Sequence, residues 1–293
     1  MRGALLACSL MAALAAQPVL PPAPGRLVDI GNGRKLHLLC GGQGSPAVVF
    51  EAGASSFAID FTNVQRELEK SHRVCSYDRA GSGWSDPLPP DALAADPSDL
   101  HALLTAAREA PPYVLVGASR GGLLVRAYLA AYPDDVAEMT AEQMRSTLPG
   151  RPVRIPRRPV QRGAPFDSLP PELYQQRLLL DERLVAAQPE TLTPEQVGRY
   201  TEHERAFLAS LLASRKAGTP FGSRPTIVLS RGDQRHKDRE DAHKALANLS
   251  TNSRHNVIDG AGHEIHLFHP RAIVNAVNDV SEAVVKRSQL RGQ

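Results

Sequence analysis

The sequence predicts an α/β protein in which helices cover both faces of a mostly parallel sheet. Short β-rich runs, each closed by glycine, aspartate or proline, alternate with helical patterns over the first half of the chain. The same alternation returns near the C-terminus. Because neighbouring parallel strands are joined by long crossovers, usually helices, this alternation indicates a largely parallel sheet.

The β-rich runs expected to form strands are residues 35–40, 47–51, 73–77, 113–117, 226–229 and 256–258. The patterns expected to form helices are residues 60–70, 98–107, 121–132, 238–249 and 271–285. The pattern at 121–132 follows its strand directly and is apolar on most faces, which predicts a well-buried helix.

The middle of the chain, about residues 139–218, has a different composition. It is rich in proline and arginine at first, and then shows amphipathic helical patterns at 171–185 and 194–214. We expect this segment to be a helical cap inserted into a single domain that spans residues 17–293.

Composition excludes several functional classes. Of 293 residues, 42% are hydrophobic and 22% charged, as in ordinary globular proteins, so a disordered or fibrous chain is excluded. The net charge of +3 is too small for binding through phosphates, and aromatic residues at 5% are too few for base stacking. No nucleic-acid partner is therefore expected.

The N-terminus predicts export. Arg2 precedes an uncharged apolar stretch over residues 4–16, and Ala13-Leu14-Ala15 has the small-x-small pattern that signal peptidase accepts. A membrane anchor is the alternative, but the stretch is shorter than the roughly 20 apolar residues that a spanning helix needs. We expect residues 1–16 to be removed and the mature protein, with no stable membrane span, to be secreted or periplasmic.

Removal of this leader takes Cys8 with it and leaves Cys40 and Cys75. A pair of cysteines in an exported chain suggests a disulfide, and two buried thiols are the alternative.

The strongest motif is Gly117-Ala118-Ser119-Arg120-Gly121, a G-x-S-x-G sequence between a predicted strand and a predicted helix. This context is typical of a nucleophile elbow, whose tight turn requires glycine on both sides of the serine. Ser119 is therefore the expected nucleophile, at a helix N-terminus that favours a developing anion.

A serine needs a base and an orienting acid, which in this kind of fold follow it in the order acid, then histidine. His263, in a loop of small residues after the last predicted strand, is the expected base. Asp233 follows the strand 226–229 and is the expected acid, with Asp238 and Asp241 as weaker alternatives.

Two backbone N–H groups are expected to stabilise a substrate oxyanion. They are those of Ala54, in the small-residue loop after strand 47–51, and of Arg120. Asp78 and Arg79, in a tight loop after another strand, are expected to be structural. His263, His266 and His269 show no H-E-x-x-H pattern, so we expect no metal, and no cofactor is implied.

The segments VVFEAGAS, RVCSYDRAGSGWSD, YVLVGASRGG and GAGHEIHLFHP occur in this order. Together they resemble the α/β-hydrolase superfamily over about residues 26–285, most closely its exported single-domain members related to prolyl aminopeptidases and esterases. The resemblance implies that Ser119 is the nucleophile, His263 the base and Ala54 part of the oxyanion hole. It also implies that the strands carrying Cys40 and Cys75 are neighbours, which favours the disulfide.

One departure from the resemblance stands out. After Tyr132-Pro133-Asp134-Asp135-Val136 the family has a further apolar strand, whereas this chain continues with AEMTAE and shows no β-rich run until Thr226. We therefore expect one central strand to be missing and residues 226–229 to pair directly with 113–116. In some relatives the catalytic acid follows that strand.

These observations predict a serine hydrolase that cleaves a small ester or amide through an acyl-enzyme, with Ser119, His263 and Asp233 as the triad. The alternative is a catalytically inactive hydrolase fold that acts as a binding protein, suggested by the missing strand and the uncertain acid.

Overall fold

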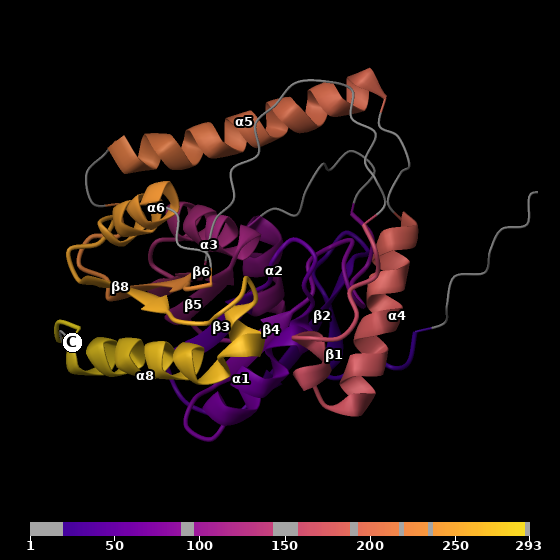
Figure 1. Cartoon of the computed structure of the whole chain (residues 1–293), viewed down its shortest axis with the longest axis horizontal. Helices are drawn as coiled ribbons and strands as arrows, with labels where there is room; N and C mark the ends of the chain where they lie inside the picture. Colours follow the sequence, from indigo (N-terminus) through magenta and orange to yellow (C-terminus); the bar gives the residue numbers. More distant parts are fainter. Residues whose placement is uncertain are drawn as a thin grey trace, which may run out of the picture.

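The computed structural model describes residues 20–88, 97–142, 158–187, 193–216, 220–233 and 237–290, so the predicted leader lies outside the described residues. Eight strands form one sheet with helices on both of its faces (Figure 1). The predicted fold class is confirmed.

The strands are β1 (Arg26–Asp29), β2 (Lys35–Gly41), β3 (Ala47–Glu51), β4 (Val74–Tyr77), β5 (Tyr113–Ala118), β6 (Val136–Glu142), β7 (Thr226–Arg231) and β8 (Ser253–Ile258). The helices are α1 (Thr62–Leu68), α2 (Pro97–Ala107), α3 (Arg120–Ala131), α4 (Pro171–Ala187), α5 (Pro194–Lys216), α6 (Lys237–Ala247), α7 (Ile265–Phe268) and α8 (Pro270–Lys286). Two short 3₁₀ turns, η1 (Ala58–Phe61) and η2 (Phe166–Ser168), complete the described elements.

The strand order in the sheet is β1-β2-β4-β3-β5-β6-β7-β8. β2 is antiparallel to both of its neighbours, and all pairs from β4 to β8 are parallel. The strands β3 and β5 therefore lie side by side in the middle of the sheet, with their carboxyl ends at the same edge. Ligand sites of open parallel sheets form at such an edge.

Alternating side chains of the central strands build two separate cores. On β3, Val49 packs with α2 and α3, whereas Val48 and Phe50 pack on the opposite face with α1 and α8. β5 follows the same period of two, and Leu115 lies on the α3 side. Burial of both faces explains why these strands consist almost entirely of apolar residues, with Glu51 at the end of β3 as the charged exception.

The expected loss of a central strand is wrong. β6 lies between β5 and β7 and is parallel to both, and its Met139 pairs with Leu115 on one side and with Thr226 on the other. β5 and β7 therefore do not pair with each other. Alanine and glutamate are depleted in strands, which hides β6 in the sequence, but hydrogen bonds to two neighbours outweigh this weak intrinsic preference.

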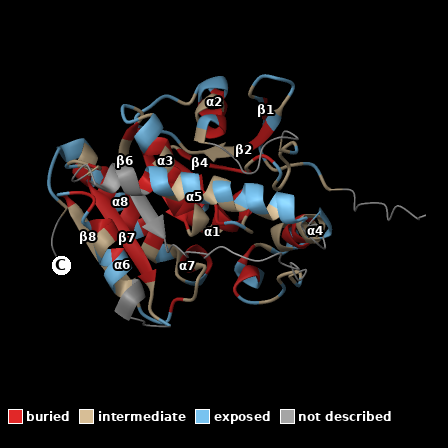
Figure 2. Ribbon diagram, turned by 90° about the horizontal axis from the view of Figure 1, so that it is seen from above, coloured by how far each residue is buried: buried red, intermediate tan, exposed pale blue. Residues whose placement is uncertain are grey.

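Because β6 extends to Glu142, residues 139–142 belong to the sheet rather than to the inserted cap. The long helices that follow, α4 and α5, occupy the region expected to be the cap. α5 lies over the face of the sheet that carries α3, and most of its residues up to Leu211, where burial is described, are exposed (Figure 2). None of the helices in the described part of the chain is long and apolar enough to cross a bilayer.

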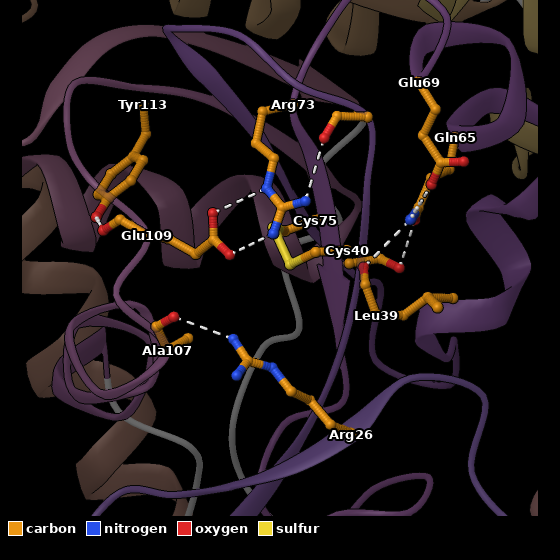
Figure 3. Close-up of a disulfide and its surroundings, with 12 residues drawn as sticks. Arg26, Leu39, Cys40, Gln65, Glu69, Arg73, Cys75, Ala107, Glu109 and Tyr113 are labelled. Carbon is orange, nitrogen blue, oxygen red and sulfur yellow. Dashed lines mark hydrogen bonds and ion pairs between the residues drawn. A yellow bond between two sulfur atoms is a disulfide. The ribbon is translucent and has the colours of Figure 1, made fainter.

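The expected disulfide between Cys40 and Cys75 is confirmed. The two residues are register partners on β2 and β4, with a Cα–Cα distance of 4.1 Å. Beside the disulfide, Arg73 donates from Nε and Nη2 to the carboxylate of Glu109, at 3.0 Å and 2.6 Å (Figure 3). The covalent bond and this bidentate ion pair together join β2, β4 and the end of α2.

We expect the double substitution Cys40→Ala, Cys75→Ala to lower the free energy of unfolding by about 3 to 4 kcal/mol, because the disulfide closes a loop of 35 residues. Urea unfolding without reductant measures the difference. The unaltered protein in reductant should match the double variant, and equal stability of oxidised and substituted proteins would contradict this prediction.

Candidate active site

Ser119 occupies a sharp turn between β5 and α3, where the sequence predicts a nucleophile elbow. Its backbone angles are φ 52° and ψ −113°, a conformation that side-chain-bearing residues rarely adopt. Holding a non-glycine residue there costs of the order of 1 to 3 kcal/mol. The surrounding structure must therefore impose this geometry on Ser119.

The two glycines of the motif show how the geometry is imposed. A Cβ atom on Gly117 would lie 2.6 Å from the backbone of Gly121, and one on Gly121 would lie 2.1 Å from the carbonyl oxygen of Glu51. Neither position has room for a side chain. The ends of β3 and β5 and the start of α3 are thus packed backbone against backbone around Ser119.

His263 lies on the loop between β8 and α7, and its Nε2 atom is 3.1 Å from Ser119 Oγ. The preceding Gly262 is also tightly packed, since a Cβ there would lie 2.4 Å from the ring of Phe268. The structure therefore brings the predicted nucleophile and the predicted base within hydrogen-bonding distance across 144 residues of chain.

Asp233 lies just after β7, and its backbone N–H donates to the carbonyl of Ala261 at 3.3 Å, next to the histidine loop. Its carboxylate accepts hydrogen bonds from Nε and Nη2 of Arg231, both at 2.5 Å. The hydrogen bond to Asp233 raises the pKa of Arg231, which keeps that guanidinium charged. Asp233 thus lies on the predicted loop, with a cation beside it.

The alternatives for the acid differ in position. Asp241 is exposed on α6, and the side chain of Asp238 is outside the described residues. The presence of β6 adds Glu142, which sequence reasoning missed because the strand itself was missed. Glu142 ends β6 in register with Ala118, the residue before the nucleophile.

Arg79 binds the carbonyl groups of the loop that is expected to form the oxyanion hole. The guanidinium donates from Nη1 to the carbonyl of Ala52 and from Nη2 to that of Gly53, both at 2.5 Å. In a trans peptide the N–H points opposite to the carbonyl, so the N–H of Ala54 is directed away from Arg79. Gly53 in turn lies against Ser119, since a Cβ on Gly53 would be 3.6 Å from Ser119 Cβ.

Arg79 is itself fixed by buried charges, in keeping with the structural role expected for it. Its Nη1 donates to Glu51 Oε1 at 2.7 Å, and the hydroxyl of Tyr77 donates to the other carboxylate oxygen. Burial raises the pKa of Glu51, although the positive charge of Arg79 opposes this effect. The tight loop after β4 therefore supports the backbone next to the nucleophile.

A cavity of about 170 Å³ opens beside Ser119 and His263. Its lining is small and polar over much of its surface, and comprises Gly53, Ala54, Ser55, Ser56, Ala118, Ser119, Gln161, His263, Glu264 and His266. The predicted nucleophile, base and Ala54 thus share one cavity. Gln161 was not anticipated, because no motif marks it. Glu264 and His266 belong to the segment GAGHEIHLFHP, but neither residue was expected to be part of the site.

Arg120, the residue after the nucleophile, has a side-chain role that the sequence did not reveal. Its Nη2 donates to Glu204 of α5 at 2.6 Å, and both side chains are about one-third exposed. The first residue of α3 is therefore linked directly to the long helix above it.

The described residues offer one cluster of potential metal ligands, formed by Cys40, Cys75 and Glu109. Because the two sulfurs are bonded to each other, this cluster provides no thiolate ligand.

Comparisons with known proteins bear on this geometry. The family described as alpha/beta hydrolase fold matches residues 46–270. The uncharacterized protein YqjL of Bacillus subtilis (strain 168) is 23% identical over 82% of this chain and 85% of its own. "Probable transporter efuK" of Hormonema carpetanum is 30% identical over 44% of this chain, and the match spans only 20% of that relative.

Solved structures show the same fold. A thermophilic esterase from Thermogutta terrifontis superposes with a TM-score of 0.63 at 21% identity, over 89% of this chain and 99% of its own. A serine hydrolase involved in carbazole degradation superposes with a TM-score of 0.60 at 18% identity, over 88% of this chain and 98% of its own.

The strained backbone at Ser119 predicts that a residue which tolerates a positive φ at this position makes the protein more stable. We expect Ser119→Gly to raise the free energy of unfolding by about 1 kcal/mol relative to Ser119→Ala, because glycine tolerates the positive φ and both variants lack Oγ. Thermal and urea unfolding of the two variants measure the difference. A glycine variant no more stable than the alanine variant would contradict the prediction.

Proposed function

Because the chain belongs to the α/β-hydrolase family, we propose that it is a serine hydrolase that cleaves a small ester or amide through an acyl-enzyme on Ser119. The observation that carries this proposal is the 3.1 Å contact between His263 Nε2 and Ser119 Oγ at the strained turn. A strained serine next to a histidine in a cavity is the arrangement that activates a hydroxyl for attack.

In the proposed mechanism, His263 Nε2 accepts the proton of Ser119 as Oγ attacks the substrate carbonyl carbon. The N–H groups of Ala54 and Arg120 stabilise the negative charge on the carbonyl oxygen, and the N-terminus of α3 adds its dipole. His263 then gives the proton to the leaving group, which departs and leaves an acyl-enzyme. Water, deprotonated by His263, releases the acid and restores Ser119.

Asp233 remains our proposed orienting acid. Its backbone bond to Ala261 links its loop to the loop of His263. A carboxylate at this edge of the sheet can hold the imidazole in the tautomer whose Nε2 accepts a proton.

The alternative, an inactive fold that acts as a binding protein, had two grounds: a missing central strand and an uncertain catalytic acid. The strand is present as β6, so the first ground no longer holds, and the acid variants described below test the second.

We further propose that the mature protein is exported and begins near residue 17. The disulfide between Cys40 and Cys75 supports this, because such bonds persist in oxidising compartments.

We expect the unaltered protein to react with a fluorophosphonate probe and to hydrolyse p-nitrophenyl butanoate, and Ser119→Ala to abolish labelling and lower kcat by roughly 10⁴- to 10⁶-fold. Ser210→Ala, at an exposed serine of α5, is the matched control and should keep both activities. Labelling or turnover that survives Ser119→Ala would exclude Ser119 as the nucleophile.

For the acid, we expect Asp233→Asn to lower kcat by about 10² to 10⁴, because the imidazole loses its orienting charge. Glu142→Gln, Asp238→Asn and Asp241→Asn are the comparison variants, assayed with the same ester. If one of these variants lost kcat to this extent while Asp233→Asn kept nearly the kcat of the unaltered protein, that residue would be the orienting acid instead of Asp233.

A further inference from the structure

One wall of the cavity is supplied by the segment before α4, through Gln161. The backbone N–H of Gln161 donates to Asp181 Oδ2 at 2.7 Å, and its side-chain Oε1 accepts from Arg177 Nη2 at 2.9 Å. The residue is therefore held both at its backbone and at the end of its side chain.

The contact with Arg177 also fixes which way the amide faces. A guanidinium only donates hydrogen bonds, so the atom next to it must be the amide oxygen. The amide nitrogen, with two N–H donors, is then the polar end of Gln161 that the cavity can use. Among the described residues, nothing accepts a hydrogen bond from this nitrogen.

Arg177 is a rigid support for this orientation. It is fully buried on α4, its Nε donates to Asp60 Oδ1 at 2.9 Å, and its guanidinium carbon lies 3.5 Å from the centre of the Phe166 ring. Removing one partner from such a buried pair is strongly unfavourable, so the guanidinium is not free to turn away from Gln161.

The size and charge of the cavity limit which substrate groups it can hold. The cavity beside Ser119 has a volume of about 170 Å³, which accommodates a short acyl or alcohol group next to the nucleophile proposed above. Glu264 is one of the residues that line the cavity, and its negative charge disfavours an anionic substrate group there. An uncharged oxygen is therefore the acceptor that best fits the Gln161 amide.

We propose that Gln161 is a specificity residue: its Nε2 donates a hydrogen bond to an uncharged ether, hydroxyl or carbonyl oxygen of a short substrate, near the bond that is cleaved. This inference rests on the proposed hydrolase function. It makes the cavity selective for oxygen-bearing esters over alkyl esters of the same length and shape.

The test compares esters that differ only by an ether oxygen in place of a methylene group. One pair changes the acyl side, p-nitrophenyl methoxyacetate against p-nitrophenyl butanoate. The other changes the alcohol side, methoxyethyl acetate against butyl acetate. The measured quantity is the ratio of kcat/KM for the oxygen-bearing ester to kcat/KM for its alkyl partner. The two esters differ in intrinsic reactivity by the same factor for every protein variant, so a change in this ratio reports a change in the protein.

The informative variant is Gln161→Glu, which keeps an oxygen for Arg177 but loses the donor. We expect it to lower the ratio about 10-fold in at least one pair, because a hydrogen bond to the substrate is replaced by repulsion between two oxygens. Gln161→Met removes the donor without adding charge and should lower the same ratio. Gln175→Glu places the same charge on an exposed position of α4 and should leave the ratio unchanged.

A ratio that stays the same in both pairs for Gln161→Glu and Gln161→Met would overturn this inference while leaving the hydrolase intact. Absence of turnover of every ester by the unaltered protein, with no fluorophosphonate labelling, would overturn the proposed function and this inference with it.

Discussion

The backbone packing around Gly121 is the constraint on which the rest of the site depends. A side chain at this position would overlap the carbonyl of Glu51, so α3 can begin where it does only because the residue is glycine. This contact sets the distance between the end of β3, which leads into the oxyanion loop, and the end of β5, which carries Ser119. The relative position of Ser119 and the proposed oxyanion loop is thus a property of the central sheet rather than of flexible loops.

Two buried ion pairs fix the orientation of chain segments that the packing around Gly121 does not hold. Arg79 and Glu51 hold the peptide planes of the oxyanion loop, while Arg177 and Asp60 hold the cap segment that contributes Gln161. Each arginine uses its several donors to link two or three chain segments at once, which a lysine could not do with the same geometry. The edge of the sheet that carries the proposed active site is therefore held in place both by the loop after β4 and by α4.

Much of the fold was predictable, because strands such as 47–51 and 113–117 are almost entirely apolar and lead into glycine or other small residues. The positions of Ser119 and His263 were predictable for a different reason. Tight turns with close backbone contacts require glycines at fixed offsets from these residues, and those glycines are visible in the sequence. β6 was not, because its Ala and Glu residues carry no strand preference and only its two neighbours make it a strand. The hydrogen bond between Gln161 and Arg177 was not predictable, because it is a contact between two segments that carry no motif.

The backbone conformation of Ser119 also bears on which substitutions the fold would favour at this position. A protein that needed only its fold would gain stability by drifting to glycine at this position, a single substitution that the local packing allows. Mutational drift in a lineage without chemistry to preserve would therefore tend to erase the serine. The proposed reaction at Ser119 therefore supplies a reason for serine at a position where folding alone would favour glycine.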